Sequence, residues 1–164
     1  DSIRIAGNEM DESIQALFKQ KYDLQIGIFD AERVKIGIGS AIPLREEITM
    51  DVRGKSFQEG LPRIITTSSG SIREALEGPL HAISDLIRRT LERTAPELAG
   101  DIYDRGIVLS GGGGLLRGLD TYLQEVIHLP FHVAKDPLTV AVRGAGMVLE
   151  EFSKYPRVYT EYNR

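Results

Sequence analysis

The sequence has 164 residues, 41% of them hydrophobic and 27% charged, the proportions of an ordinary globular chain that can bury one core or two small subdomains. The net charge of −4, without a basic stripe, argues against a nucleic-acid partner. The absence of cysteine excludes disulfides and thiolate chemistry, and no run approaches the roughly 20 apolar residues that span a bilayer. None of the three histidines stands at metal-ligand spacing from a second ligand, so no metal site is predicted.

The first 40 residues predict one short strand and two helices. Residues 3–5 alternate between apolar and charged, which is typical of a strand. Asn8 is a candidate N-cap for a helix that ends near residues 21–22. Asp30 is a candidate N-cap for a second helix over residues 31–39, where two glycines would each cost about 1 kcal/mol relative to alanine. We therefore expect that tertiary packing holds this second helix in place, or that its C-terminal part is short.

A β-hairpin is predicted in the next segment. Residues 48–52 alternate between apolar and polar, and residues 61–67 carry β-branched side chains at their end. Turn residues separate the two runs. We expect them to pair in a small antiparallel sheet.

A long helical segment follows over residues 68–93. Ser71 and Glu74 have the spacing of a capping box, and Pro79 should interrupt or restart the helix. A further short helix is expected to begin near Pro96, because proline is favoured in a first turn.

Four consecutive glycines are the strongest indication of function. They follow the apolar run 106–110 and precede a predicted helix near Leu119. A backbone without Cβ atoms lets a flat or anionic ligand approach its N–H groups, and a helix N-terminus would add a positive dipole end at the same place. The alternative is a tight strand-to-helix turn without a ligand.

The last elements are a strand over residues 130–134 and a helix opened by Asp136-Pro137, with apolar side chains expected to be buried. The segment from Phe152 is rich in tyrosine, and no element is assigned to it. The whole order predicts an α/β core interrupted by a small α+β insert.

Four segments resemble the MreB family of bacterial actins. They are residues 3–12, 90–98, 104–120 and 136–146, and the similarity runs in the same order from about Ser2 to Glu150. The resemblance implies a partial actin-like ATPase lobe, with a ribonuclease-H-like core and a small inserted subdomain.

The implied subdomains have definite boundaries. Residues 1–20 and 70–150 would form the core of the second lobe, residues 21–69 the small subdomain, and residues 151–164 a C-terminal tail. The opening at Asp1, without an initiating methionine, leads us to expect a fragment of a longer protein.

The resemblance also implies where ATP would bind. Glu32 and Lys35 are similar to the family's pair that faces the nucleoside, and their spacing of three places them on one helical face. Their alternative role is an exposed helical ion pair. The glycines would pass under the base and ribose, which makes the predicted cofactor-binding residues Gly111, Gly112, Gly113, Gly114, Glu32 and Lys35.

The family's catalytic parts are not found in this sequence. By resemblance, the first phosphate loop, the magnesium-binding aspartate and the water-positioning residue belong to a first lobe, and the second phosphate loop would lie just before Asp1. Phosphoryl transfer depends on these groups, so the intact protein would be an ATPase and this chain inactive alone.

The resemblance implies partners and location as well. The intact protein would form filaments at the inner face of the cytoplasmic membrane, contact its N-terminal lobe and cell-shape membrane proteins, and organise cell-wall synthesis. Residues 40–69 are candidates for filament contacts, and membrane contact would be indirect. The alternatives are a lobe of a related chaperone or sugar-kinase ATPase, and a stand-alone interaction fragment, which would expose strand edges and apolar surface.

Overall fold

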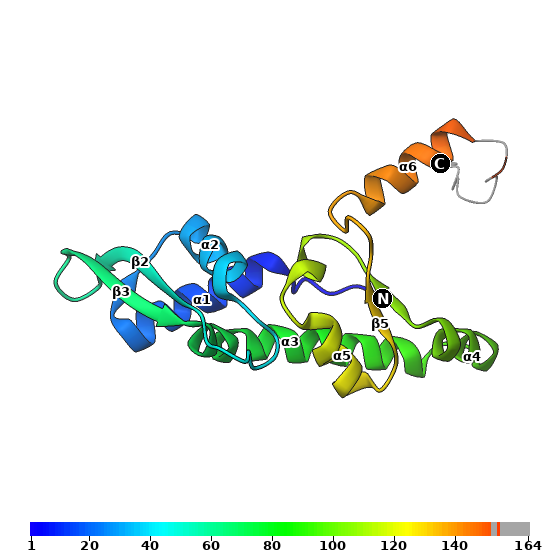
Figure 1. Ribbon diagram of the computed structural model, residues 1–164, viewed down its shortest axis with the longest axis horizontal. Helices are drawn as coiled ribbons and strands as arrows, with labels where there is room; N and C mark the ends of the chain where they lie inside the picture. The colour runs from blue at the N-terminus through cyan, green and yellow to red at the C-terminus, as the bar shows by residue number, and fades with distance from the viewer. Residues whose placement is uncertain (152–153, 155–164) are drawn as a thin grey trace, which may run out of the picture.

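The computed structural model describes residues 1–151 and 154, and Figure 1 shows how its elements are arranged. In chain order they are α1 (Gly7–Tyr22), β1 (Leu24–Gln25), α2 (Ile28–Ile38), β2 (Thr49–Ser56), β3 (Pro62–Ser68), α3 (Ser69–Glu92), α4 (Pro96–Arg105), β4 (Ile107–Leu109), the 3-10 helix η1 (Gly112–Leu115), α5 (Leu119–Ile127), β5 (Phe131–Val133) and α6 (Val140–Glu150).

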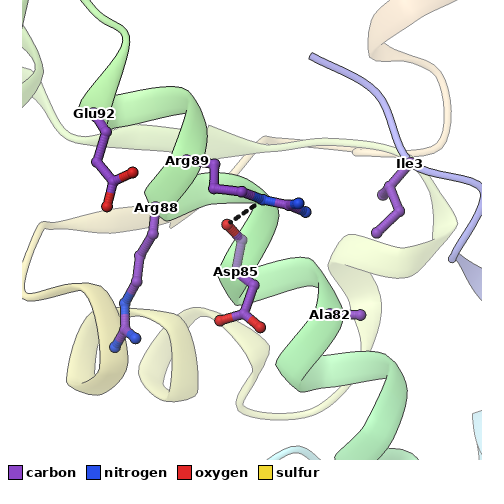
Figure 2. Close-up of a pocket in the computed structure, with 6 residues that line it drawn as sticks. All are labelled: Ile3, Ala82, Asp85, Arg88, Arg89 and Glu92. Atoms are coloured by element: carbon purple, nitrogen blue, oxygen red, sulfur yellow. Dashed lines mark hydrogen bonds between the residues drawn. The ribbon is translucent and has the colours of Figure 1, made fainter.

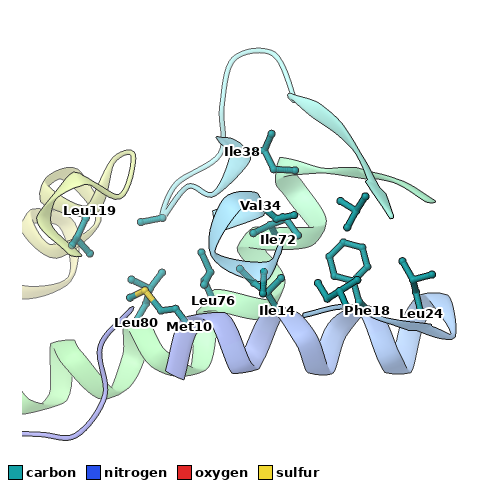
Figure 3. Packing of buried hydrophobic residues seen from close by; sticks show 14 of the residues in the cluster. Met10, Ile14, Phe18, Leu24, Val34, Ile38, Ile72, Leu76, Leu80 and Leu119 are labelled. Atoms are coloured by element: carbon teal, nitrogen blue, oxygen red, sulfur yellow. The ribbon is translucent and has the colours of Figure 1, made fainter. Parts of the chain in front are cut away.

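The core lies between α1, α2 and α3 (Figure 3). Met10, Ile14 and Phe18 recur every four residues along α1, so they share one face, and all three are buried. They meet Val34 of α2 and Leu76 of α3, which are also fully buried. Because one continuous cluster joins residues before, within and after the predicted insert, the packing holds the insert against the core.

The predicted hairpin is confirmed. β2 and β3 pair antiparallel from Thr49 opposite Ser68 to Lys55 opposite Pro62, and the two-residue β1 pairs with the end of β2. Val52 points into the core and its cross-strand partner Ile65 is half-buried, as the alternation predicts.

The long helix α3 is continuous, so the prediction that Pro79 interrupts it is wrong. Pro79 removes one backbone hydrogen bond, but its side chain is buried in the middle of the helix, between the buried Leu76 and Leu80. The packing of this face outweighs the missing bond. The N-cap is Ser68, whose hydroxyl accepts from the Ser71 N–H at 3.3 Å.

Two other helix starts differ from the prediction. α1 begins after Ala6, whose N–H donates to the Glu9 carboxylate at 2.8 Å, and this hydrogen bond holds the pKa of Glu9 below its usual value. α2 begins after Gly27. Asn8 and Asp30 therefore lie inside first turns, where the carboxylate of Asp30 still suits the helix dipole.

The C-terminal half holds a two-stranded parallel sheet, in which β4 pairs with β5 from Ile107 opposite Phe131 to Leu109 opposite Val133. These strands, α5 and the helix beginning at Pro96 are confirmed. The predicted strand over residues 3–5 is wrong, because within the described residues this segment forms no hydrogen-bonded ladder with any strand.

The last helix also departs from expectation. α6 begins at Val140, after a turn in which Asp136 accepts from the Thr139 hydroxyl at 2.6 Å. None of its residues is buried, and Figure 1 shows it extending away from the other elements. The predicted burial of its apolar side chains is therefore wrong within the described residues.

The predicted C-terminal tail, residues 151–164, lies outside the described residues except at positions 151 and 154. A search of the described helices found none with the length and hydropathy of a membrane span.

Candidate functional site

The glycine segment forms a compact turn after β4. Gly111 adopts a φ of +80°, which favours glycine, and its N–H donates to the Pro137 carbonyl at 2.8 Å. Gly112 to Leu115 then make one 3-10 turn, and α5 begins only at Leu119. The helix predicted near Leu119 is therefore confirmed, and a 3-10 turn and a short link separate it from the glycines.

The four glycines differ in what surrounds them. Gly114 is buried, and a Cβ there would contact Leu109. A Cβ on Gly113 would meet nothing within 4 Å, and Gly113 does not have a positive φ. The fold itself therefore places no steric demand for glycine at position 113, and a side chain there would project into open space.

A cavity of about 430 Å³ lies between this turn, the start of α1 and the middle and last turns of α2. Four of the six predicted residues line it: Glu32, Lys35, Gly112 and Gly113. Gly111 and Gly114 are not among its lining residues. The other lining residues are Gly7, Asn8, Met10, Ile36, Leu115, Leu116 and Leu138.

The cavity has an apolar rim that protein does not cover. Ile36, Leu115 and Leu138 line it and are each more than half exposed. Exposed apolar side chains gathered around a concavity are typical of a ligand site, because the ligand covers them when it binds.

Lys35 is committed to an ion pair across two helices. Its Nζ lies 2.8 Å from Oδ1 of Asp11 and 3.0 Å from the Gly7 carbonyl oxygen. Asp11 is 3% exposed, so the pair is largely shielded from solvent and ties α2 to the start of α1. The alternative role for Lys35, an ion pair with Glu32, is not what the structure shows.

Sequence reasoning missed Asp11, although a signal was present. Asp11 lies three residues before Ile14 and seven before Phe18, on the buried face of α1. A carboxylate on such a face needs a partner, because burying a lone charge is costly. That requirement indicated a cation on a neighbouring element.

Glu32 remains available at the rim of the cavity. Its side chain is exposed, and within the described part of the chain it forms neither an ion pair nor a hydrogen bond. The ion pair between neighbouring turns of α2 is instead Asp30 with Arg33, at 2.8 Å. A free carboxylate beside apolar walls and open glycine backbone suits a flat ligand that carries hydroxyl groups.

A second cavity, of about 370 Å³, lies between Ile3 and α3 (Figure 2). Its arginines are engaged with backbone carbonyls: Arg88 donates to Val126 at 2.9 Å, and Arg89 donates to Asp85 at 3.3 Å. None of the predicted site residues reaches it. No group of three or more potential metal ligands gathers within residues 1–151 and 154.

Comparison with known proteins assigns the fold and the family. The family model of the MreB/Mbl protein matches residues 1–157. The cell shape-determining protein MreB of Escherichia coli (strain K12) is 47% identical over 149 residues, which cover 91% of this chain and 43% of that protein. The cell shape-determining protein Mbl of Bacillus subtilis (strain 168) is 38% identical over 156 residues, covering 95% and 47%.

Two solved structures extend the comparison. MreB5 of Spiroplasma citri bound to AMPPNP is 37% identical, with a TM-score of 0.90 over 94% of this chain and 46% of that one. A MamK double helical filament is 26% identical, with a TM-score of 0.78 over 91% and 46%. The α/β architecture is therefore part of an actin-like fold, as the sequence predicted. The chain spans less than half the length of these relatives, and it belongs to the MreB/Mbl family.

Proposed function

We propose that this chain supplies the nucleoside end of an ATP site in an MreB-like protein. Glu32, Lys35 and the glycines of residues 111–114 would contact the adenosine. The observation that carries the proposal is the convergence of Glu32, Lys35, Gly112 and Gly113 on one cavity, from segments about 80 residues apart in the sequence. Support comes from MreB5 structures bound to AMPPNP and to ADP.

The roles of these groups follow from their chemistry. The carboxylate of Glu32 would accept hydrogen bonds from ribose hydroxyls, and the bare backbone at Gly112 and Gly113 would lie against the flat face of the base. Lys35 would line the site with its aliphatic stem while its ammonium holds Asp11. No cation of the lining set is free to grip phosphates, because Lys35 is its one basic residue.

This distribution of charge favours binding without catalysis. Transfer of a phosphoryl group requires charge neutralisation by cations and Mg²⁺ around the phosphates. The phosphate-binding groups and the magnesium ligands would come from another part of the intact protein, which would be the ATPase. The described part of this chain is proposed to contribute binding energy and no chemical step.

The whole protein is proposed to assemble into filaments. The MamK filament and the names of the relatives support a cytoskeletal role in cell shape. Residues 40–69, which carry the β2–β3 hairpin, are proposed as one filament contact, and the N-terminal lobe and membrane proteins of the cell-shape machinery as further partners. The filaments would lie on the cytoplasmic side of the membrane and organise wall synthesis there, and this chain would reach the membrane only indirectly.

A calorimetric titration with adenosine, AMP, ADP and ATP tests the nucleoside site. We expect weak binding that changes little with the number of phosphates. A steep rise in affinity with each phosphate, or hydrolysis of ATP by this chain alone, would refute the proposed division of labour.

The matched variants are Gly113→Ala and Gly144→Ala. Each adds one methyl group where nothing lies within 4 Å, one in the cavity and one on α6. Both should leave stability unchanged or raise it by up to about 1 kcal/mol. Gly113→Ala alone should weaken adenosine binding, by about tenfold or more, because the methyl group occupies space beside the base. Equal binding by both variants would show that the glycine backbone is not part of the site.

A further inference from the structure

The end of α2 is fastened to the exit of the glycine turn by one arginine. Arg117 donates from its guanidinium to the carbonyl oxygens of Ile36, at 3.4 Å, and Gly39, at 3.3 Å. These are among the last carbonyls of the helix, which lack partners within it and favour a cation. Arg117 thus caps a helix from a segment about 80 residues away in the sequence.

The backbone of Arg117 makes a second connection to the same place. Its carbonyl accepts from the Ala41 N–H at 2.8 Å, and it forms a parallel bridge with Ser40. Ser40 is completely buried, and Ala41 is 7% exposed. We name residues 39–42, which run between these contacts, the strap.

The strap is held closely from both sides. Gly118 has a φ of +69°, and a Cβ there would come within 2.4 Å of Ile42. In addition, Arg73 of α3 donates to the Ile42 carbonyl at 3.3 Å. These contacts fix the strap itself beside the turn, and the guanidinium of Arg117 adds the link between the turn and the end of α2, which precedes the strap.

This connection joins the two walls of the cavity. Ile36 belongs to the α2 wall, and Leu115 and Leu116, which directly precede Arg117, belong to the opposite wall. We propose that Arg117 is a positioning residue that fixes the separation of these walls, and thereby the affinity of the site. The part concerning affinity rests on the nucleoside function proposed above.

Arg117 does not line the cavity, and its side chain is largely exposed. Its guanidinium bonds are near the long limit for hydrogen bonds, so their loss should cost little global stability. The expected effect is a wider range of wall separations. A site that is competent in only a fraction of molecules binds with an affinity reduced by that fraction.

The distance between the walls can be measured directly, because the sequence contains no cysteine. Phe29→Cys on α2 and Thr121→Cys on α5 place spin labels at two exposed positions outside the cavity. Pulsed electron spin resonance should give one narrow distance distribution for this labelled parent. Arg117→Ala should broaden it, and Arg117→Lys should broaden it less, because lysine can still donate to a carbonyl.

Arg33→Ala is the matched control, because it removes an arginine of α2, the helix that Arg117 caps, and among the described residues this arginine forms an ion pair with the half-exposed Asp30 alone. Calorimetry with adenosine and ADP should show affinity about 3 to 10 times lower for Arg117→Ala and unchanged for Arg33→Ala. Circular dichroism and thermal unfolding should show that each variant is folded.

The outcomes separate this inference from the proposed function. An unchanged distance distribution in Arg117→Ala would overturn the positioning role, and so would a broadened distribution with unchanged affinity. Weaker binding with an unchanged distribution would show that Arg117 contacts the ligand directly. Failure of the unsubstituted chain to bind adenosine or ADP would refute the proposed function, and the distance comparison would still decide whether Arg117 joins the walls.

Discussion

Two helical regions of the molecule bury their apolar residues very differently. The first comprises α1, α2 and the first half of α3, and the second comprises α4 and α6. α1 carries fully buried side chains such as Phe18, while no residue of α4 or α6 is buried. Leu149 of α6 is 70% exposed and Leu76 of α3 is 0% exposed, although both are helical leucines. Local signals, such as helix-start residues and apolar spacing, therefore predicted the helices in both regions but could not predict which of them would pack against a partner.

The candidate site lies between α1 and α2 of the first region and the glycine turn, and no residue of α4 or α6 lines it. Its α1 and α2 wall is fixed by buried side chains and by the Lys35–Asp11 pair. Its other wall is a 3-10 turn together with Leu138, with fewer buried contacts behind it. Because one wall is packed against the core and the other is less well supported, the separation of the walls depends on the few contacts that join them. Arg117 makes two of these contacts.

The largest difference between the regions should appear in a pair of identical substitutions. Leu76→Ala should lower the free energy of unfolding by about 2–5 kcal/mol, because it leaves a cavity in the core. Leu149→Ala should change it by less than about 0.5 kcal/mol. Urea denaturation of both variants measures the contrast, and a similar loss in both would mean that α6 is packed in solution.

A smaller effect is expected from the ion pair that fixes the α2 wall. Asp11→Ala should cost about 3 kcal/mol, because it leaves the ammonium of Lys35 without its buried partner. Asp30→Ala, which breaks the exposed pair with Arg33, should cost about 0.5 kcal/mol or less. If urea denaturation showed the same loss of unfolding free energy for both variants, burial would not make the Lys35–Asp11 pair more stabilising than the Asp30–Arg33 pair.

The smallest expected effect is a dependence of the free energy of unfolding on pH, through the carboxyl of Glu47, which follows the strap in the sequence. The hydroxyl of Ser69 donates to Glu47, and with Arg73 it holds the pKa of that carboxyl below its usual value of 4.5. A carboxyl with a lowered folded pKa contributes stability above its unfolded pKa and loses it as pH falls through the folded pKa. Unfolding measured from pH 6 downward should therefore show a loss beginning near pH 4.5.

Glu47→Gln should remove this part of the pH dependence, and the neighbouring Glu46→Gln is the control. The same slope below pH 4.5 in Glu47→Gln and in the unsubstituted chain would argue against the Ser69 contact as its source.

Much of the site was predictable from local sequence. The glycine turn follows a strand because an apolar run ends in residues that tolerate tight turns, and Glu32 and Lys35 share a helical face because of their spacing. The contacts that close the site were not predictable in this way. Asp11 meets Lys35 and Arg117 meets the Ile36 carbonyl, and in each pair the two residues belong to separate segments that no local pattern brings together.

The sequence by itself determined the order and type of most elements, the glycine turn and the resemblance to bacterial actins, because periodicity, turn residues and motifs are local properties of the chain. Only the tertiary structure decided that Pro79 stays inside a helix, that Lys35 pairs with Asp11, that α6 remains exposed and that Arg117 joins the cavity walls. Each of these outcomes depends on which surfaces of distant segments come together or remain apart. Local signals, such as a proline or an apolar spacing, do not contain that information.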